Sequence, residues 1–323
     1  MNLNPLAGLY RAAIAIRNML YDRGVFGSRR LQRPVVSVGN LSTGGSGKTP
    51  FVIALGELLK ERAIRFDVLS RGYGRKTRGV RIVDPNGSVA EFGDEPLLIA
   101  RRLGVPVIVG ESRYAAGVLA EQKFESQLHI LDDGFQHRSL ARDFDIVLMT
   151  DRDFTDGLLP MGRLREPLSA LARAHAIVLP QDSAQGAFSV HDLAIENLRR
   201  QGKLIWRAQR EIVVPPNLVS PIVFCGIARP QQFFAQVRGA GIVPAAEIVF
   251  RDHHAYDLDD IQALLSTRRD RVGVGFVTTE KDAINLGSER HCLDPLAIAE
   301  LILTLGDSSE ILDGILSKII FPK

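Results

Sequence analysis

The amino-acid sequence predicts an α/β protein with a mostly parallel sheet, a second, smaller α/β domain and an amphipathic helix at the N-terminus. From residue 33 onward, short β-branched runs alternate with helical patterns, which is the pattern of stacked βαβ units. The 323 residues are 46% hydrophobic, enough apolar material for two medium-sized cores. The stretch from Glu211 to Pro221 carries three prolines and predicts a connection between two domains.

The first element is a helix expected over residues 3 to 21. Apolar residues recur at helical spacing at Leu3, Leu6, Tyr10, Ala13 and Leu20, with Ile14 and Ile16 beside them and Arg11 and Asn18 opposite. Such a stripe is typical of a helix that packs on a domain, and periodicity alone favours that interpretation. It also suits a helix that lies in a membrane interface. Arg17 falls on the apolar register and weakens both interpretations.

The strands and helices that follow predict two α/β units. In the first, strands are expected near 34–39, 65–70, 105–109, 128–131, 145–149 and 176–179, and helices near 49–62, 95–103 and 112–124. In the second, strands are expected near 222–225, 246–250, 273–278 and 298–303, and helices near 230–239 and 258–267. The helices have lengths that suit parallel crossover connections. We expect an N-terminal helix region over 1–30, a larger domain over 31–215 and a smaller domain over 216–323 that contributes to the active-site cleft.

Composition narrows the classes of function. The formal net charge of +3 is mildly basic, which suits an anionic substrate or a membrane surface and does not indicate nucleic-acid binding. Cys225 and Cys292 lack metal-ligand spacing and form no disulfide framework, which favours a reducing, cytoplasmic compartment. No apolar run approaches the roughly 18 to 20 residues that span a bilayer, and no secretory cleavage pattern is present. We therefore expect a protein that is neither secreted nor membrane-spanning.

The firmest functional element is the segment VVSVGNLSTGGSGKTP at residues 35–50. An apolar strand leads into a glycine-rich turn that ends in Gly47-Lys48-Thr49, and a helical pattern follows, which is the context of a phosphate-binding loop, or P-loop. Backbone N–H groups of such a turn and the helix N-terminus bind phosphate oxygens. Lys48 is expected to contact the β and γ phosphates of a nucleotide, and Thr49 to hold Mg²⁺. The predicted phosphate cradle is Ser42, Thr43, Gly44, Gly45, Ser46, Gly47, Lys48 and Thr49, with Ser42 in place of the usual first glycine.

Carboxylates and histidines at other strand ends are the candidate catalytic groups. Asp132 and Asp133 end an apolar strand, where P-loop enzymes place a carboxylate that completes a Mg²⁺ shell directly or through water. Asp94 precedes a helix, so it is either a helix cap or a base that takes the proton of an attacking hydroxyl. His253 and His254 follow a strand of the second domain. Adjacent histidines are poorly placed to share a metal, whereas one histidine paired with a carboxylate from the other domain would form a catalytic dyad.

Arginines in loops are candidate ligands for an anionic substrate. Arg71 and Arg75 flank a Gly-Tyr-Gly turn, and Arg163 and Arg165 lie in the stretch 150–170, which is rich in Asp, Arg, Gly and Pro. Guanidinium groups in such loops either clamp phosphates or belong to a solvated surface. The stretch 150–170 is too long for an ordinary connection, and long loops at strand ends usually carry function.

Six segments, taken in order, resemble the tetraacyldisaccharide 4′-kinase family of the lipid A pathway in Gram-negative bacteria. They are Gly44-Gly-Ser-Gly-Lys48-Thr49-Pro50, Ser70-Arg-Gly-Tyr-Gly-Arg75, Gly93-Asp-Glu-Pro96, Leu131-Asp-Asp-Gly-Phe-Gln-His137, Gly162-Arg-Leu-Arg-Glu-Pro167 and Asp252-His253. The similarity runs from the N-terminal helix to at least Asp282 and so covers most of the chain. Six ordered motifs are far more specific than one P-loop.

The resemblance implies a kinase with ATP and Mg²⁺ as cosubstrates that phosphorylates the 4′-hydroxyl of tetraacyldisaccharide 1-phosphate. It implies that Asp94 is the catalytic base, assisted by His253, while Lys48 acts on the phosphates. The residues implied around Mg²⁺ are Thr49, Asp132 and Asp133. It also implies an interfacial N-terminal helix on the cytoplasmic face of the bacterial inner membrane, against the packing interpretation of that segment. The side chains expected to contact the lipid disaccharide are Arg71, Arg75, Glu95, Arg163, Arg165 and Glu166.

The residues alone leave two other functions open. This form of P-loop also occurs in nucleotide-dependent switches and chaperone ATPases, and Thr279–Asp282 either resembles the base-reading loop of G proteins or is an ordinary polar turn. A preference for GTP, with water as the only acceptor, would favour a switch or chaperone ATPase. A membrane-recruited binding module would need idle carboxylates, and transfer to any lipid sugar would exclude it. The sequence indicates no nucleic-acid partner and no obligate protein partner.

Overall fold

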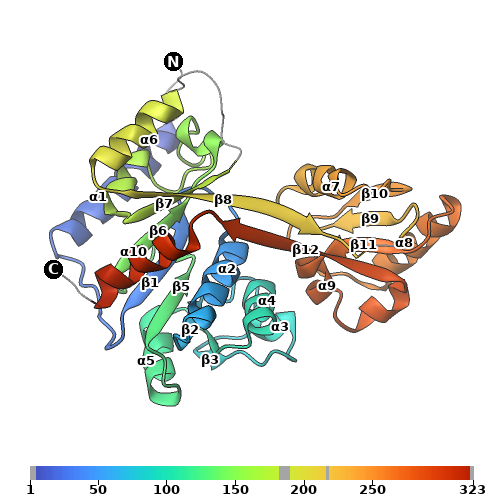
Figure 1. Ribbon diagram of the computed structural model, residues 1–323, viewed down its shortest axis with the longest axis horizontal. Helices are drawn as coiled ribbons and strands as arrows, with labels where there is room; N and C mark the ends of the chain where they lie inside the picture. Colours follow the sequence, from blue (N-terminus) through green and yellow to red (C-terminus); the bar gives the residue numbers. More distant parts are fainter. Residues whose placement is uncertain (1–4, 182–189, 216–217, 321–323) are drawn as a thin grey trace.

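The computed structural model describes residues 5–181, 190–215 and 218–320, and within these residues one sheet of 12 strands runs through the molecule in the order β10-β9-β11-β12-β8-β7-β6-β1-β5-β2-β4-β3 (Figure 1). The strands are β1 (Val35–Asn40), β2 (Phe66–Ser70), β3 (Arg81–Ile82), β4 (Val107–Val109), β5 (Leu128–Asp132), β6 (Phe144–Leu148), β7 (Ala176–Pro180), β8 (Leu204–Val213), β9 (Ile222–Cys225), β10 (Ala246–Val249), β11 (Phe276–Thr279) and β12 (Leu296–Leu305). The helices are α1 (Pro5–Asp22), α2 (Lys48–Glu61), α3 (Val89–Phe92), α4 (Asp94–Leu103), α5 (Arg113–Lys123), α6 (Val190–Arg200), α7 (Pro230–Gly239), α8 (Leu258–Asp270), α9 (Glu280–Asn285) and α10 (Ser308–Ile320).

The central strand β1 explains where the functional loops gather. It is buried along its whole length and pairs in parallel with β5 on one side and β6 on the other. Strand β2 pairs in parallel with β5. Because parallel strands end at the same edge of a sheet, the loops after β1, β2 and β5 meet there. The predicted mostly parallel sheet is confirmed, and ligands of such sheets bind at this edge.

Two long antiparallel strands, β8 and β12, join the two parts of the molecule. They pair from Val213 opposite Glu300 to Ala208 opposite Leu305, and Figure 1 shows them spanning from the larger part to the group of elements from β9 to α9, here called the β9–α9 unit. The prediction of a plain connection from Glu211 to Pro221 is wrong at its start, because residues 211–213 belong to β8. Within that stretch, residues 216 and 217 lie outside the described residues.

The helix α10 returns to the larger part of the molecule. Its residues Ile311, Leu312 and Ile315 are buried in the same apolar cluster as Phe51 of α2 and Phe144 of β6. The end of the chain therefore packs beside the P-loop helix, and not within the smaller domain expected over residues 216–323. The sequence cannot reveal this return, because an apolar helix face does not specify which core it covers.

The N-terminal helix α1 packs through polar contacts and turns much of its apolar surface outward. Tyr10 donates to the backbone oxygen of Arg165 (3.0 Å), Arg17 donates to that of Gln136 (2.5 Å), and Asn18 donates to Glu166 (3.2 Å). Arg17 is thus explained by a partner on the larger part of the molecule. Leu9 is 68% exposed and Ile16 is 54% exposed, as are Leu6 and Met19 in large part. Of the predicted apolar stripe, Leu6 and Ala13 are exposed whereas Tyr10 and Leu20 are half-buried, so the expectation that it packs inward is met only in part; Leu3 lies outside the described residues.

Helices of the described residues include none that is both long enough and apolar enough to cross a membrane.

Candidate active site

The loop between β1 and α2 has the backbone of a phosphate cradle. Gly44, Gly45 and Gly47 have φ values of 74°, 56° and 86°, in the left-handed region that glycine adopts without strain. These turns orient successive N–H groups toward one point in front of the first turn of α2. The hydroxyl groups of Ser42 and Ser46 are buried there without a hydrogen-bond partner among the described residues. The strand, loop and helix predicted for residues 35–50 are confirmed.

Lys48 lies in a network of charges at the edge of β1. Its Nζ is 3.3 Å from Oδ1 of Asn40 and 3.5 Å from Oδ1 of Asp133. Arg165 donates to both carboxylate oxygens of Asp133, at 2.9 and 3.1 Å, and to the side chain of Asn40. Burial would raise the pKa of Asp133, but Lys48 and Arg165 hold that pKa well below its usual range. Asp133 is therefore a firmly ionised carboxylate beside the P-loop lysine.

Asp132 has the features of a cation ligand. Its Oδ2 accepts a hydrogen bond from Ser70 (3.1 Å), whereas its Oδ1 is buried and has no partner among the described residues. Burial, with Glu95 and Asp133 nearby, raises the pKa of Asp132 to about 7. A buried carboxylate oxygen without a donor, between acidic neighbours, suits a divalent cation held by oxygen ligands.

Thr49, the third residue predicted to hold the metal, is buried in the first turn of α2. In the part of the chain that the structure describes, no group of three or more His, Cys, Asp and Glu side chains could hold a metal. Mg²⁺ does not need such a group, because it retains several waters and takes one or two carboxylates together with substrate phosphates. The residues present therefore suit Mg²⁺ bound with a nucleotide.

Asp94 and His253 are in contact, although they come from the two parts of the molecule. Oδ2 of Asp94 lies 2.7 Å from Nδ1 of His253, and Oδ1 accepts the N–H of Glu95 (2.9 Å). Asp94 is the first residue of α4, while its helix cap is Gly93. Burial would raise the pKa of Asp94, but His253 and Lys281 outweigh it and lower that pKa. The hydrogen bond from Asp94 raises the pKa of His253, against its burial.

The β9–α9 unit presents one cationic or titratable side chain from each of three strand ends. Arg229 follows β9 and lies over the P-loop, where its Nε is 3.0 Å from the position that a Cβ on Gly45 would take. His253 follows β10 and reaches Asp94, and Lys281 follows β11 and forms an ion pair with Glu95. These three contacts bring the β9–α9 unit onto the same sheet edge that carries the phosphate cradle.

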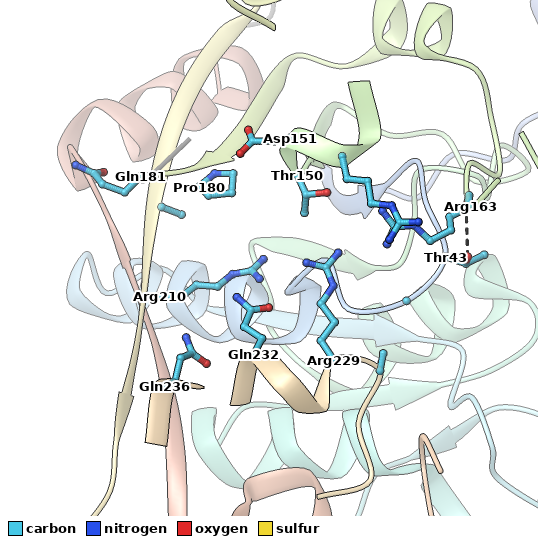
Figure 2. A pocket seen from close by; sticks show the side chains of 14 residues that line it. Thr43, Thr150, Asp151, Arg163, Pro180, Gln181, Arg210, Arg229, Gln232 and Gln236 are labelled. Carbon is cyan, nitrogen blue, oxygen red and sulfur yellow. Dashed lines mark hydrogen bonds between the residues drawn. The ribbon is translucent and has the colours of Figure 1, made fainter. Parts of the chain in front are cut away.

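A cavity of about 660 Å³ opens beside the P-loop (Figure 2). Thr43 and Gly44 line it on the side of the cradle, and Gln181, Gln232 and Gln236 add amide groups. Among the described residues four arginines line it, and Figure 2 labels three of them: Arg210 from β8, Arg229 at the start of α7, and Arg163. Arg210 also donates to the backbone oxygen of Ser46. The cavity combines cations near the cradle with amides farther from it.

The predicted substrate arginines divide into two groups. Arg75 pairs with Glu111 (2.7 Å) and donates to the backbone oxygen of Gly79, and Arg163 pairs with Asp156 (2.8 Å). The first contact ties the loop after β2 to the loop before α5, and the second lies within the stretch 150–170, so both guanidinium groups have carboxylate partners in the protein. Arg165 instead reaches Asp133 at the strand edge, and Arg71 is exposed.

Glu95 and Glu166, the two acidic residues predicted to contact the substrate, both form ion pairs within the protein. Glu166 is fully buried and pairs with Arg173 (2.6 Å), in addition to the contact from Asn18 of α1. Glu95 pairs with Lys281. His254 contacts Asp260 at 2.7 Å and not Asp94, so the two adjacent histidines have separate partners. Glu166 therefore links the 163–166 loop to α1, while Glu95 links α4 to the β9–α9 unit.

Four site residues were not predicted: Asn40, Arg210, Arg229 and Lys281. Asn40 could have been found, because it is a polar residue that ends a buried strand directly before the P-loop. Arg210 carried no signal, since its strand β8 was not expected. Arg229 and Lys281 follow predicted strands of the second unit, where a parallel sheet places functional side chains.

Comparisons with known proteins agree on one family. A family model described as Tetraacyldisaccharide-1-P 4′-kinase (LpxK) matches residues 1–319. The chain is 48% identical over 327 residues to the Tetraacyldisaccharide 4′-kinase of Koribacter versatilis, covering 98% of each chain. It is 39% identical over 293 residues to that of Aquifex aeolicus, covering 88% of this chain and 89% of the other. A crystal structure of LpxK from Aquifex aeolicus in complex with ATP matches with a TM-score of 0.79 at 35% identity and covers 98% of both chains.

Proposed function

The chain belongs to the tetraacyldisaccharide-1-P 4′-kinase family, the ATP-dependent kinases of lipid A biosynthesis, and we propose that it transfers the γ-phosphoryl group of ATP to the 4′-hydroxyl of tetraacyldisaccharide 1-phosphate with Asp94 as the base. The observation that carries the assignment of the base is the 2.7 Å contact between Asp94 and His253. The contact joins the two parts of the molecule at the sheet edge where the P-loop begins. Glu95, the next residue, lies close enough to Asp132 to raise the pKa of that carboxyl.

ATP occupies the loop and the cavity together in this proposal. The triphosphate lies against the N–H groups of residues 42–49, with Lys48 on the β and γ phosphates. The ribose and base extend into the cavity, where Gln181, Gln232 and Gln236 offer donors and acceptors. Arg210 and Arg229 contribute positive charge at the entrance to the cradle. Burial lowers the pKa of both guanidinium groups. Arg229 lowers the pKa of Arg210 further, and Arg163 lowers that of Arg229. An anionic ligand would therefore offset the repulsion between these positive charges.

Mg²⁺ would be held by Thr49, Asp132 and Asp133 together with the phosphates. When bound, it supplies neutralisation of charge on the β and γ phosphates. The orphaned Oδ1 of Asp132 supports this assignment. Asp133 already accepts hydrogen bonds from Arg165, which favours an outer role for it, through water.

The chemical step is an in-line displacement at the γ phosphorus. A bond forms between the 4′ oxygen and the γ phosphorus, the bond from that phosphorus to the bridging oxygen breaks, and its electron pair leaves on ADP. Asp94 accepts the proton of the 4′-hydroxyl. A carboxylate of lowered pKa is ionised at neutral pH. His253 binds Oδ2, so the proton of the acceptor would go to Oδ1, which accepts the N–H of Glu95. Phosphoryl transfer depends mainly on such positioning and charge neutralisation.

The acceptor lies, in this proposal, between the loop after β2 and helix α1. Arg71 is exposed there, and the pKa of nearby His137 is lowered by burial and then by Arg113, Arg142, Arg17 and Arg71. A concentration of guanidinium groups suits the 1-phosphate of the acceptor. Arg75 and Arg163 are proposed to shape the loops around the acceptor, since Arg75 ties the loop after β2 to Glu111 in the loop before α5, and Arg163 binds Asp156 within the stretch 150–170.

Helix α1 is proposed to hold the enzyme peripherally on the cytoplasmic face of the bacterial inner membrane. It exposes Leu6, Leu9, Ile16 and Met19, while its polar residues Tyr10, Arg17 and Asn18 face the larger part of the molecule. A helix packed by its polar side and apolar on its outer side suits a lipid interface. We also propose that residues 31–215 form the kinase domain and that the β9–α9 unit acts as a smaller domain that closes on it.

The proposal is tested by incubating the protein with γ-labelled ATP, Mg²⁺ and the disaccharide 1-phosphate and separating the products by chromatography. Label should appear in a bisphosphorylated lipid, and hydrolysis without the acceptor should be slow. Hydrolysis of GTP with water as the only acceptor would contradict the proposal and favour a switch or chaperone ATPase.

A further inference from the structure

Helices α4 and α9 exchange two ion pairs that run in opposite directions. Lys281 of α9 pairs with Glu95 of α4, and Arg102 of α4 pairs with Glu280 of α9 (2.9 Å). Each helix therefore gives one cation and one carboxylate. The two residues of α4 lie seven positions apart, about 10 Å along a helix, so the first turn of α9 spans most of α4. Arg102 also reaches Glu300 of β12 (2.8 Å).

Lys281 is the cation of these two ion pairs whose charge acts on the proposed base. Its side chain is 26% exposed. Burial would lower the pKa of Lys281, but the charges of Glu95 and Asp94 outweigh burial and raise that pKa, so the ammonium group stays charged. Lys281 thus contacts the residue after Asp94 and faces Asp94 itself from the other part of the molecule.

The backbone that carries Lys281 is fixed by its neighbour Asp282. Asp282 is buried and accepts hydrogen bonds from the N–H of Gly226 (2.9 Å), the hydroxyl of Tyr256 (2.9 Å) and the hydroxyl of Thr279 (2.6 Å). Gly226 follows β9, Tyr256 follows β10 and Thr279 ends β11, the three strands that Arg229, His253 and Lys281 follow. Asp282 therefore makes one rigid platform of the loops that face the P-loop.

We infer that Lys281 is a positioning residue for phosphoryl transfer: by pairing with Glu95 it fixes the first turn of α4 against the platform that carries His253, and so assembles the contact between Asp94 and His253. The inference rests on the proposed function of Asp94 as the base. It gives a role to the segment Thr279–Asp282, which resembles a base-reading loop in sequence. Lys281 pairs with Glu95 and is not among the residues that line the cavity beside the P-loop, where the base is proposed to bind.

Lys281 also sets the electrostatic surroundings of Asp94. The charged groups that face Asp94 and Lys281 are His253 and Asp252 from the loop after β10, Asp282 from α9, and Glu95 from α4 itself. Removing the lysine takes away a positive charge and leaves Glu95 uncompensated, and both changes disfavour the ionised form of Asp94. Asp94 must be ionised to accept a proton, so the loss of activity on acidification should begin at a higher pH.

The test compares Lys281→Met and Lys281→Arg with the unmodified enzyme at saturating ATP and acceptor across a pH series. The methionine variant should lower kcat by about 10- to 100-fold, a part of what a general base contributes. The KM for ATP should change by less than about twofold, because the P-loop is untouched. The acid limb of the kcat profile should move to higher pH, and arginine should restore most of the rate. In an Asp94→Asn background, Lys281→Met should cause little further loss, because it acts through Asp94.

Arg102→Met is the matched control, since it removes a cation from the same pair of helices at the end far from Asp94. It should lower the melting temperature without moving the acid limb. Thermal melts of all variants identify any that fail to fold, and Lys281→Gln replaces the methionine variant if needed. A Lys281 variant with unchanged kcat and pH profile, alongside an inactive Asp94→Asn, would overturn the inference alone. Full activity of Asp94→Asn would instead overturn the proposed function.

Discussion

Asp94 and His253 touch at 2.7 Å across 159 residues of sequence, and each comes from a different part of the molecule. Asp94 starts α4 beside the P-loop edge, whereas His253 follows β10 in the β9–α9 unit. The two parts that bring this contact together are linked by the paired strands β8 and β12 and by the ion pairs between α4 and α9. Closure of the β9–α9 unit on the P-loop would at once assemble the dyad, place Arg229 over the cradle and exclude water from the phosphates.

Replacement of His253 by alanine should slow transfer and change its pH dependence. The hydrogen bond from His253 holds the pKa of Asp94 down against burial, so its loss raises that pKa and moves the acid limb of kcat to higher pH. We expect kcat to fall by roughly 10- to 100-fold. His254→Ala is the control, because His254 contacts Asp260 and not Asp94. Equal effects of the two substitutions, measured as pH profiles of initial rate, would contradict the assignment.

Replacement of Asp132 by asparagine should weaken the use of Mg²⁺. Oδ1 of Asp132 is buried without a partner among the described residues, and an amide in its place carries no charge for a cation. The Mg²⁺ concentration that supports half-maximal binding of a fluorescent ATP analogue should rise by at least about 10-fold. Ser70→Ala removes only the donor to Oδ2 and should have a smaller effect. An unchanged Mg²⁺ titration would exclude Asp132 from the metal site.

Replacement of Arg229 by alanine should weaken ATP binding. Arg229 lies over Gly45 of the P-loop and lines the cavity, so its loss removes a charge-assisted contact. The Kd for ATP, measured by calorimetry, should rise by about 10- to 100-fold. Arg238 lies at the other end of the same helix and pairs with Glu247. Arg238→Ala should leave ATP binding within about twofold, and a comparable loss would point to a general effect on α7.

Charges placed on the outer face of α1 should release the protein from membranes. Leu9 and Ile16 are 68% and 54% exposed, so Leu9→Asp with Ile16→Asp should leave the melting temperature nearly unchanged. Sedimentation with vesicles of anionic phospholipid should fall by at least about 10-fold, because two apolar contacts become charged. Tyr10→Phe, which loses only the contact to Arg165, should still sediment. Binding by the doubly charged variant equal to that of the native chain would show that α1 does not mediate attachment.

The parts of the site that lie within one strand and its following loop were predictable from sequence. The P-loop and the pair Asp132-Asp133 belong to this class, because strand, turn and helix are specified by neighbouring residues. The contact of Asp94 with His253 was expected only through resemblance to a family, since no local pattern joins residues so far apart. Position alone left Asp94 open between a cap and a base, and the structure places Gly93 at the cap.

The features that escaped prediction depend on partners distant in sequence. From Gln209 to Val213, β8 alternates exposed and half-buried residues just before the prolines, and its pairing with β12 supplies the hydrogen bonds that make this part a strand. Arg210 was missed with it. Arg17 looked like a flaw in an amphipathic helix because its partner, the backbone oxygen of Gln136, lies in another loop. Helical periodicity shows on which face of a helix the apolar residues lie, but it does not show which face packs against the rest of the protein.

The most direct test of the central claim is single-turnover phosphoryl transfer by Asp94→Asn with γ-labelled ATP and the disaccharide 1-phosphate, with ATP affinity measured alongside. The account predicts that transfer slows by roughly 100- to 10,000-fold while ATP binds within about twofold of its normal affinity. Transfer by Asp94→Asn at the normal rate, with ATP bound normally, would show that Asp94 is not the base.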